Sequence, residues 1–181
     1  MKRFYFSAAL LLCAVALFAQ DYKIENGAVV FTRVYENTGK TIDEMHKAME
    51  AYFARAYNDV NSTEKLNQQD HFIYKGMFVK TGVYQMGMWT IDVPHTIDVS
   101  IKENRMRVQI IVTTGIYRSL GTSPNKSEYQ IAAAAPFEVS NNARFLKKES
   151  THTFEVVQAR CNDIFADIEN SINNSTTDED W

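Results

Sequence analysis

The feature that most constrains this chain is a regular alternation of apolar and polar residues over positions 96–113. Successive side chains of a strand point to opposite faces, so the alternation predicts two strands that each have one apolar face. A two-residue turn at Glu103-Asn104 would join them, because asparagine tolerates a left-handed backbone. This turn aligns three apolar pairs, namely Ile101 with Met106, Val99 with Val108, and Ile97 with Ile110. A slip of one residue would place apolar side chains opposite polar ones, so the register is well specified.

Two segments with helical periodicity would supply the layer that covers this apolar face. The first spans residues 41–57, where Thr41 and Glu44 have the spacing of a capping box. The second spans residues 149–173. In both segments the apolar side chains recur at steps of three and four, which places them on one side of a helix. They are Ile42, Met45, Met49, Tyr52, Phe53 and Ala56 in the first segment, and Phe154, Val157, Cys161, Ile164, Phe165, Ile168 and Ile172 in the second.

Two further segments predict strands, and a third is ambiguous. Residues 27–36 are rich in β-branched and aromatic side chains and predict a first strand. Residues 71–80 predict another strand, in which Gly76 marks a bulge. Residues 83–92 are apolar without a clear period. Pro94 indicates that a strand there begins or is interrupted, because proline has no N–H to donate to a neighbouring strand.

The connections between these elements differ in length and composition. Residues 58–69 are polar and predict a loop. Between residues 70 and 117 the pattern allows three or four strands. Residues 119–148 form a long mixed connection, with an extra strand near Gln130 or Phe137.

The order of elements predicts a two-layer α+β fold, with an antiparallel sheet and two helices on one of its faces. No internal repeat or linker rich in Pro, Gly or Ser divides residues 27–173, so we expect one domain there. Residues 174–181 are polar and acidic and predict a flexible tail. The second face of the sheet would then be open to solvent.

The N-terminus has the pattern of a secretory signal peptide over residues 1–19. Lys2 and Arg3 precede an apolar run that ends at Ala19, a small residue typical of a cleavage site. The apolar run is shorter than the ~20 residues of a membrane-spanning helix. Cys13 does not fit a lipoprotein signal, because the bulky Leu12 precedes it. We therefore expect a periplasmic or extracellular protein without a transmembrane segment once the signal is cleaved.

Charge and cysteine content narrow the classes of partner. The chain has 19 basic and 22 acidic residues, and loss of Lys2 and Arg3 with the signal changes the net charge from −3 to −5. Sequence-independent binding of nucleic acid requires a basic surplus, so no nucleic-acid partner is expected. Cys161 would be the one cysteine of the mature chain, which excludes a disulfide within it.

The residues that usually carry catalysis or bind metals form no signature. The four histidines have no two members at ligand spacing, so no metal site is predicted. They are His46, His71, His95 and His152. Two Ser-x-x-Lys matches, at Ser62 and Ser123, fall in polar stretches read as loops. Cys161 lies on the apolar stripe of a helix and is expected in the core. No catalytic residue and no cofactor are predicted.

The open face of the sheet is the candidate binding surface. In the predicted register, Ser100 lies opposite Arg107 and Asp98 lies opposite Gln109. Tyr74 joins this surface if the even-numbered side chains of residues 71–80 point outward. Aromatic side chains among polar groups on an exposed sheet are typical of binding surfaces. The alternative is that the connection 119–148 folds over this face and makes it a second small core.

Three stretches of the chain carry a resemblance to a known family. They are residues 30–34 (VFTRV) continuing into 39–45 (GKTIDEM), residues 73–76 (IYKG), and residues 96–108 (TIDVSIKENRMRV). With these stretches the chain resembles the exported bacterial domain of unknown function 4468 family. The resemblance implies a TATA-binding-protein-like (TBP-like) fold of order β-α-β-β-β-β-α and an exported location, and it implies no activity.

Together these expectations favour an exported, non-enzymatic binding or assembly module of the bacterial cell envelope. Its partner would be an envelope protein, a glycan or a lipid component. One alternative is an envelope hydrolase that uses His71 or His95 with a carboxylate at a strand edge. Another is a structural domain that self-associates into a homo-oligomer through an exposed strand edge.

Overall fold

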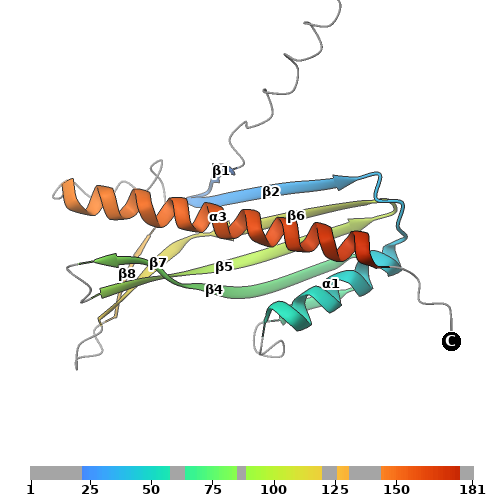
Figure 1. The fold of residues 1–181 in the computed structure, drawn as a ribbon, viewed down its shortest axis with the longest axis horizontal. Helices are drawn as coiled ribbons and strands as arrows, with labels where there is room; N and C mark the ends of the chain where they lie inside the picture. The colour runs from blue at the N-terminus through green and yellow to red at the C-terminus, as the bar shows by residue number, and fades with distance from the viewer. Residues whose placement is uncertain (1–21, 58–63, 85–88, 120–125, 131–143, 176–181) are drawn as a thin grey trace, which may run out of the picture.

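Eight strands form one antiparallel sheet, and both helices lie on the same face of it (Figure 1). The computed structural model describes residues 22–57, 64–84, 89–119, 126–130 and 144–175, and these statements refer to that part of the chain. The elements are β1 (Tyr22–Glu25), β2 (Ala28–Glu36), α1 (Ile42–Ala56), β3 (Glu64–Gln68), β4 (His71–Tyr84), β5 (Trp89–Lys102), β6 (Arg105–Val112), β7 (Thr114–Ser119), β8 (Lys126–Gln130) and α3 (Arg144–Asn174). The predicted two-layer α+β class is confirmed.

The order of strands in the sheet is β1-β2-β6-β5-β4-β3. β7 pairs with β5 at residues 89–92, beyond the segment of β5 that pairs with β6, and β8 pairs with β7. The β5–β6 hairpin has the predicted register, with Ile101 opposite Met106 and a left-handed Asn104 at φ 60°. Alternation and turn chemistry therefore suffice to place this hairpin.

Both helices turn the large apolar side chains of their predicted stripes toward the sheet, whereas Ala56 at the end of α1 is exposed. At the start of α1 the Thr41 side chain accepts from the Glu44 N–H at 3.3 Å, and the Glu44 carboxylate accepts from the Thr41 N–H at 2.8 Å, as the capping box predicts. The Tyr35 hydroxyl donates to the Phe165 carbonyl at 2.7 Å and so joins β2 to α3. Helix α3 begins at Arg144, earlier than the predicted residue 149. Cys161 is fully buried in the core, as predicted.

Several strands lie where the sequence was read as loop or left undecided. β3 occupies part of the predicted loop 58–69, because an edge strand with one paired side needs no continuous apolar pattern. β8 confirms the extra strand near Gln130, whereas Phe137 lies outside the described residues. For residues 70–117 the sequence allowed three or four strands, and the structure has four there, namely β4, β5, β6 and β7.

Pro94 does not interrupt its strand. Its residue pair on β4 is Met77, and on the other side of β5 it falls between Asp92, which pairs with β7, and His95, which pairs with β6. A proline is tolerated at this position because no described ladder partner requires its missing N–H. The strand therefore runs through Pro94, and the sequence-based expectation of a break was wrong.

Gly76 does not mark a bulge either. The β4–β5 register is continuous through Gly76 opposite His95, and the irregularity lies between Phe78 and Gly82. Lys80 there has a left-handed φ of 54°, and its N–H donates to the Asp92 carboxylate at 2.8 Å. The glycine at position 76 is instead required by a close approach of side chains.

We expect Gly76→Ala to lower the free energy of unfolding by about 1–3 kcal/mol, the cost typical of overpacking. A Cβ at Gly76 would lie 2.6 Å from Nε2 of His95 and 2.7 Å from Cε1 of Tyr57. Urea denaturation followed by circular dichroism measures this loss. The matched control is Lys75→Ala, an exposed position on the other face, for which we expect about 0.5 kcal/mol or less. Equal stability of the two variants would contradict this account.

The predicted signal peptide (1–19) and residues 176–181 of the predicted tail lie outside the described residues, while α3 extends to Asn174. Within the described part of the chain, no helix has the length and apolar character needed to cross a membrane.

Candidate functional site

One face of the sheet is covered by neither α1 nor α3 (Figure 1), and we call it the open face. Alternation along each strand and pairing across strands decide which side chains it carries. Two rows run straight across it, from Thr32 through Gln109 and Asp98 to Ile73, and from Val34 through Arg107 and Ser100 to His71. These rows contain four of the five residues predicted for the binding surface, which are Asp98, Ser100, Arg107 and Gln109.

Polar contacts link these residues across the strands. The Arg107 guanidinium donates to the Ser100 hydroxyl at 3.3 Å. The Gln109 amide donates to the Thr32 hydroxyl at 3.3 Å. Each of these bonds uses one N–H of a guanidinium or amide group that has several hydrogen-bonding atoms. Most of the hydrogen-bonding capacity of Arg107 and Gln109 therefore still faces solvent.

Tyr74 lies on the opposite, helix-covered face, so its assignment to the binding surface was wrong. Its side chain is 1% exposed, and its ring stacks on Phe53 of α1 with centroids 3.5 Å apart. The cause is the pairing of Tyr74 with Ile97, whose side chain belongs to the core. In this strand both sets of alternate residues contain large apolar side chains, so its own alternation could not tell which set faces inward.

A shallow hollow of about 280 Å³ lies at the hairpin end of the open face. We call it the basic hollow, and its lining is Ser100, Lys102, Arg105 and Arg107. Lys102 and Arg105 are directly opposite each other in the register. Arg105 forms an ion pair with Glu36 of β2 at 3.2 Å, and both partners are more than half exposed. Such an exposed pair contributes little to stability because solvent screens it.

Apolar side chains also reach solvent on this face. Val34 is 38% exposed, Met77 40% and Val79 53%. Thr90 and Asp92 belong to the same face by the alternation of β5, but they lie at the end of the sheet that carries β7 and β8, and there they are buried. The alternative in which the connection 119–148 covers this face concerns residues that lie largely outside the described part of the chain.

His71 and Asp98 lie within hydrogen-bond distance of each other on the open face, with Nε2 and Oδ1 3.1 Å apart. A histidine oriented by a carboxylate is the arrangement of a general base, and this pair is the observation that favours the hydrolase alternative. Both side chains are about one third exposed. Ser100 lies directly opposite His71, but its hydroxyl accepts from Arg107, and no hydrogen bond joins it to His71 among the described residues.

His95 is a core residue on the helix-covered face. Its Nε2 lies 3.0 Å from the Tyr57 hydroxyl, and its ring stacks on Phe78 with centroids 3.9 Å apart. Burial lowers the pKa of His95 to about 4, and hydrogen bonding of the imidazole to the backbone carbonyl of Val93 partly opposes this effect. The imidazole is therefore neutral at physiological pH. In the described residues no carboxylate is hydrogen-bonded to it, in contrast to His71.

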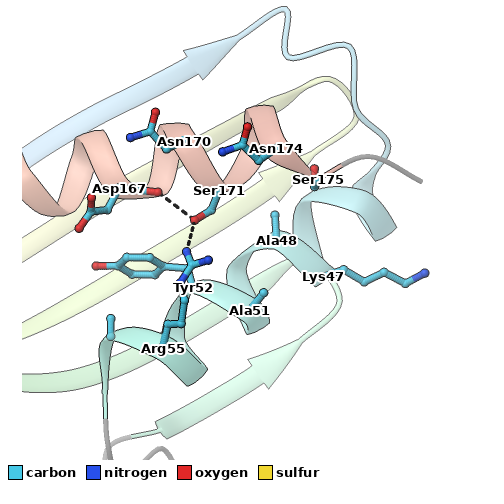
Figure 2. A pocket seen from close by; sticks show the side chains of 11 residues that line it. Lys47, Ala48, Ala51, Tyr52, Arg55, Asp167, Asn170, Ser171, Asn174 and Ser175 are labelled. Carbon is cyan, nitrogen blue, oxygen red and sulfur yellow. Dashed lines mark hydrogen bonds between the residues drawn. The ribbon is translucent and has the colours of Figure 1, made fainter. Parts of the chain in front are cut away.

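A larger groove of about 630 Å³ lies between α1 and α3 on the outer side of the helix layer (Figure 2). Its walls combine polar side chains with the alanines Ala48, Ala51 and Ala56 of α1. Arg55 of α1 bridges it by donating to the Ser171 hydroxyl at 2.9 Å. Its lining also includes Lys47, Tyr52, Asp167, Asn170 and Asn174. The groove was not predictable from the sequence, because these polar residues have the pattern of solvated outer faces of separate helices and become neighbours only when the helices pack.

The described residues contain no group of three or more His, Cys, Asp or Glu side chains arranged to hold a metal ion. Burial raises the pKa of the Cys161 thiol, which disfavours the thiolate that nucleophilic chemistry requires.

No family model and no curated protein sequence matches the chain. Two solved structures are similar to it. A TBP-like protein from Parabacteroides distasonis is 12% identical, with a TM-score of 0.66 over 85% of this chain and 98% of that one. A DUF4468 family protein from Bacteroides ovatus is 14% identical, with a TM-score of 0.56 over 90% and 95%. These likenesses confirm the TBP-like fold that the sequence resemblance implied, and they concern the fold alone.

Proposed function

We propose that this chain is an exported, non-enzymatic binding module of the cell envelope and that the open face is its binding surface. The observation that supports this proposal best is the open face itself, where exposed apolar side chains lie beside hydrogen-bonding and charged groups. A mixed surface of this kind is typical of recognition sites. The signal-peptide pattern of residues 1–19 supports the exported location.

To test the binding surface, we would replace Val34 and Met77 together by aspartate. Both side chains are exposed, so the variant should fold, while two new charges would weaken any apolar contact with a partner. We expect residues 20–181 to retain a component of envelope extract that the folded double variant retains at least about tenfold less. Affinity capture followed by mass spectrometry measures this difference.

The matched control is Ile24→Asp. Ile24 is 42% exposed but lies on β1, paired with Val29 of the helix-covered side. It carries the same change away from the open face, so it should capture what the parent chain captures. Equal capture by all three proteins would contradict the proposal.

The same experiment separates the two alternatives. A captured component that the parent chain cleaves, and that His71→Ala leaves intact, would establish the hydrolase function instead. A second copy of the chain as the captured component would establish self-association. β4 extends beyond its pairing with β3, but Lys75, Lys80 and the bulge after Phe78 are features that discourage pairing between strand edges.

A further inference from the structure

We propose that the basic hollow binds a phosphate group carried by the ligand of this module. This inference rests on the proposed function of the open face and names the chemistry of one part of it. It starts from an unfavourable arrangement of charge at the hairpin end of β5 and β6.

Three cationic side chains crowd this corner of the sheet. Lys102 and Arg105 are directly opposite each other, and Arg107 follows Arg105 on the same face of β6. Like charges directly opposite in a sheet repel and destabilise it. The chain as a whole has a net charge of −3, so this local concentration of positive charge runs against its composition.

Two carboxylates lie near this corner, Glu36 of β2 and Glu103 of the turn, and Glu103 forms no ion pair with a described residue. Glu36 pairs with Arg105, while neither Lys102 nor Arg107 forms an ion pair with a described residue. Lys102 and Arg107 therefore face the hollow without an ion-pair partner among the described residues, although Arg107 donates to the Ser100 hydroxyl. A bound anion would relieve the repulsion between these two cations, which gives the arrangement a physical use.

The donors and the charge suit phosphate better than a monovalent anion. A phosphate monoester carries about −1.5 to −2 at pH 7, which matches the two cations without an ion-pair partner among the described residues. The Arg107 guanidinium offers a planar fork for two phosphate oxygens, and Lys102 offers an ammonium. Ser100 accepts from Arg107, so its own hydroxyl hydrogen is available to donate. All three groups present donors.

The size of the hollow indicates that it holds one group and not a whole ligand. Its volume of about 280 Å³ lies just below the ~300–1,000 Å³ of pockets that enclose small molecules. The rest of the ligand would then extend over the neighbouring rows of the open face, toward Asp98 and Gln109. Because the site is exposed, its affinity should fall as salt rises.

The test is a titration of ¹⁵N-labelled protein with inorganic phosphate at constant ionic strength, followed by NMR of backbone and arginine side-chain signals. We expect saturable shifts confined to the basic hollow, and none when chloride replaces phosphate. Arg107→Ala should weaken binding about tenfold or more, because hydrogen bonds to charged groups are lost. Lys75→Ala removes a cation elsewhere on the open face and should bind as the parent does.

A second variant guards against a merely structural effect of Arg107. Lys102→Glu should abolish phosphate binding and at the same time raise the melting temperature at low salt, since it replaces repulsion with attraction. A loss of binding in a more stable protein cannot be attributed to unfolding. Unsaturable shifts, or equal binding by the parent chain and Arg107→Ala, would overturn the inference.

Two further arms identify the source of the phosphate. One measures cosedimentation with phosphatidylcholine vesicles with and without phosphatidic acid, and the other measures binding of glycerol 3-phosphate. If the parent chain binds vesicles that contain phosphatidic acid and Arg107→Ala does not, the phosphate belongs to a lipid headgroup. If the same difference is found with glycerol 3-phosphate, the phosphate belongs to a soluble ester. If the protein does not bind phosphate, but the Val34/Met77 double variant captures less of the envelope component than the parent chain, this inference alone is refuted. If the protein binds phosphate, but the double variant captures as much as the parent chain, the proposed envelope partner alone is refuted.

Discussion

Replacing Tyr74 by alanine should lower the free energy of unfolding by about 3–5 kcal/mol, the usual cost of removing a large buried aromatic side chain. The ring stacks on Phe53 at 3.5 Å and also lies 6.2 Å from the ring of Phe72. Its removal would leave a cavity between α1 and the sheet. Urea denaturation at pH 7 measures the loss.

The control for this prediction is Arg107→Ala on the open face, where we expect a change of about 0.5 kcal/mol or less. The comparison tests directly which face of β4 is inside. If Tyr74→Ala prevents folding, Tyr74→Leu retains part of the volume and should give a smaller but measurable loss. A loss below about 1 kcal/mol for Tyr74→Ala would mean that the side chain is on the surface.

Acidification should destabilise the protein through His95. Burial lowers its pKa from the ordinary 6.5 to about 4 in the folded state, so the unfolded chain takes up a proton first as pH falls. The contribution of the neutral imidazole is complete above pH 6.5 and is lost progressively down to pH 4. A shift of this size corresponds to about 3 kcal/mol.

The measurement is the free energy of unfolding of the parent chain and of His95→Phe at several pH values between 7 and 4. The variant is expected to lose stability less steeply, since it has no imidazole to protonate. Tyr57→Phe removes the hydroxyl 3.0 Å from Nε2 but keeps the imidazole buried, so it should retain the steep dependence. Parallel curves for the parent chain and His95→Phe would contradict the assignment.

The side chains of the open face were predictable where local pairing decides which face they occupy. Ser100 opposite Arg107 and Asp98 opposite Gln109 follow from the hairpin register, which a two-residue turn and an alternating pattern specify. Tyr74 was not predictable in this way, because its face depends on how β4 pairs with β5.

The same distinction holds for the histidines. The sequence shows His71 and His95 as two isolated residues with no ligand spacing. Pairing of β4 with β5 brings His71 within reach of Asp98, while packing of Tyr57 and Phe78 encloses His95. The surroundings of His71 and of His95 leave no signal in the sequence, because the residues around each histidine come from segments that are distant in the chain and have no fixed spacing.

The elements specified by the sequence are those whose partners lie within about 20 residues or one helix. They are the β5–β6 hairpin, the capping box at Thr41 and Glu44, and the apolar stripes of the two helices, because these depend on the periodicity of backbone geometry and on side chains that reach their own neighbours. Tertiary packing settled which face of β4 is buried, where the helices leave a groove, and that Glu36 of β2 forms an ion pair with Arg105. Those outcomes depend on contacts between segments that are distant in the chain. The burial of a residue and the charges around it are set by these contacts and not by its immediate sequence neighbours.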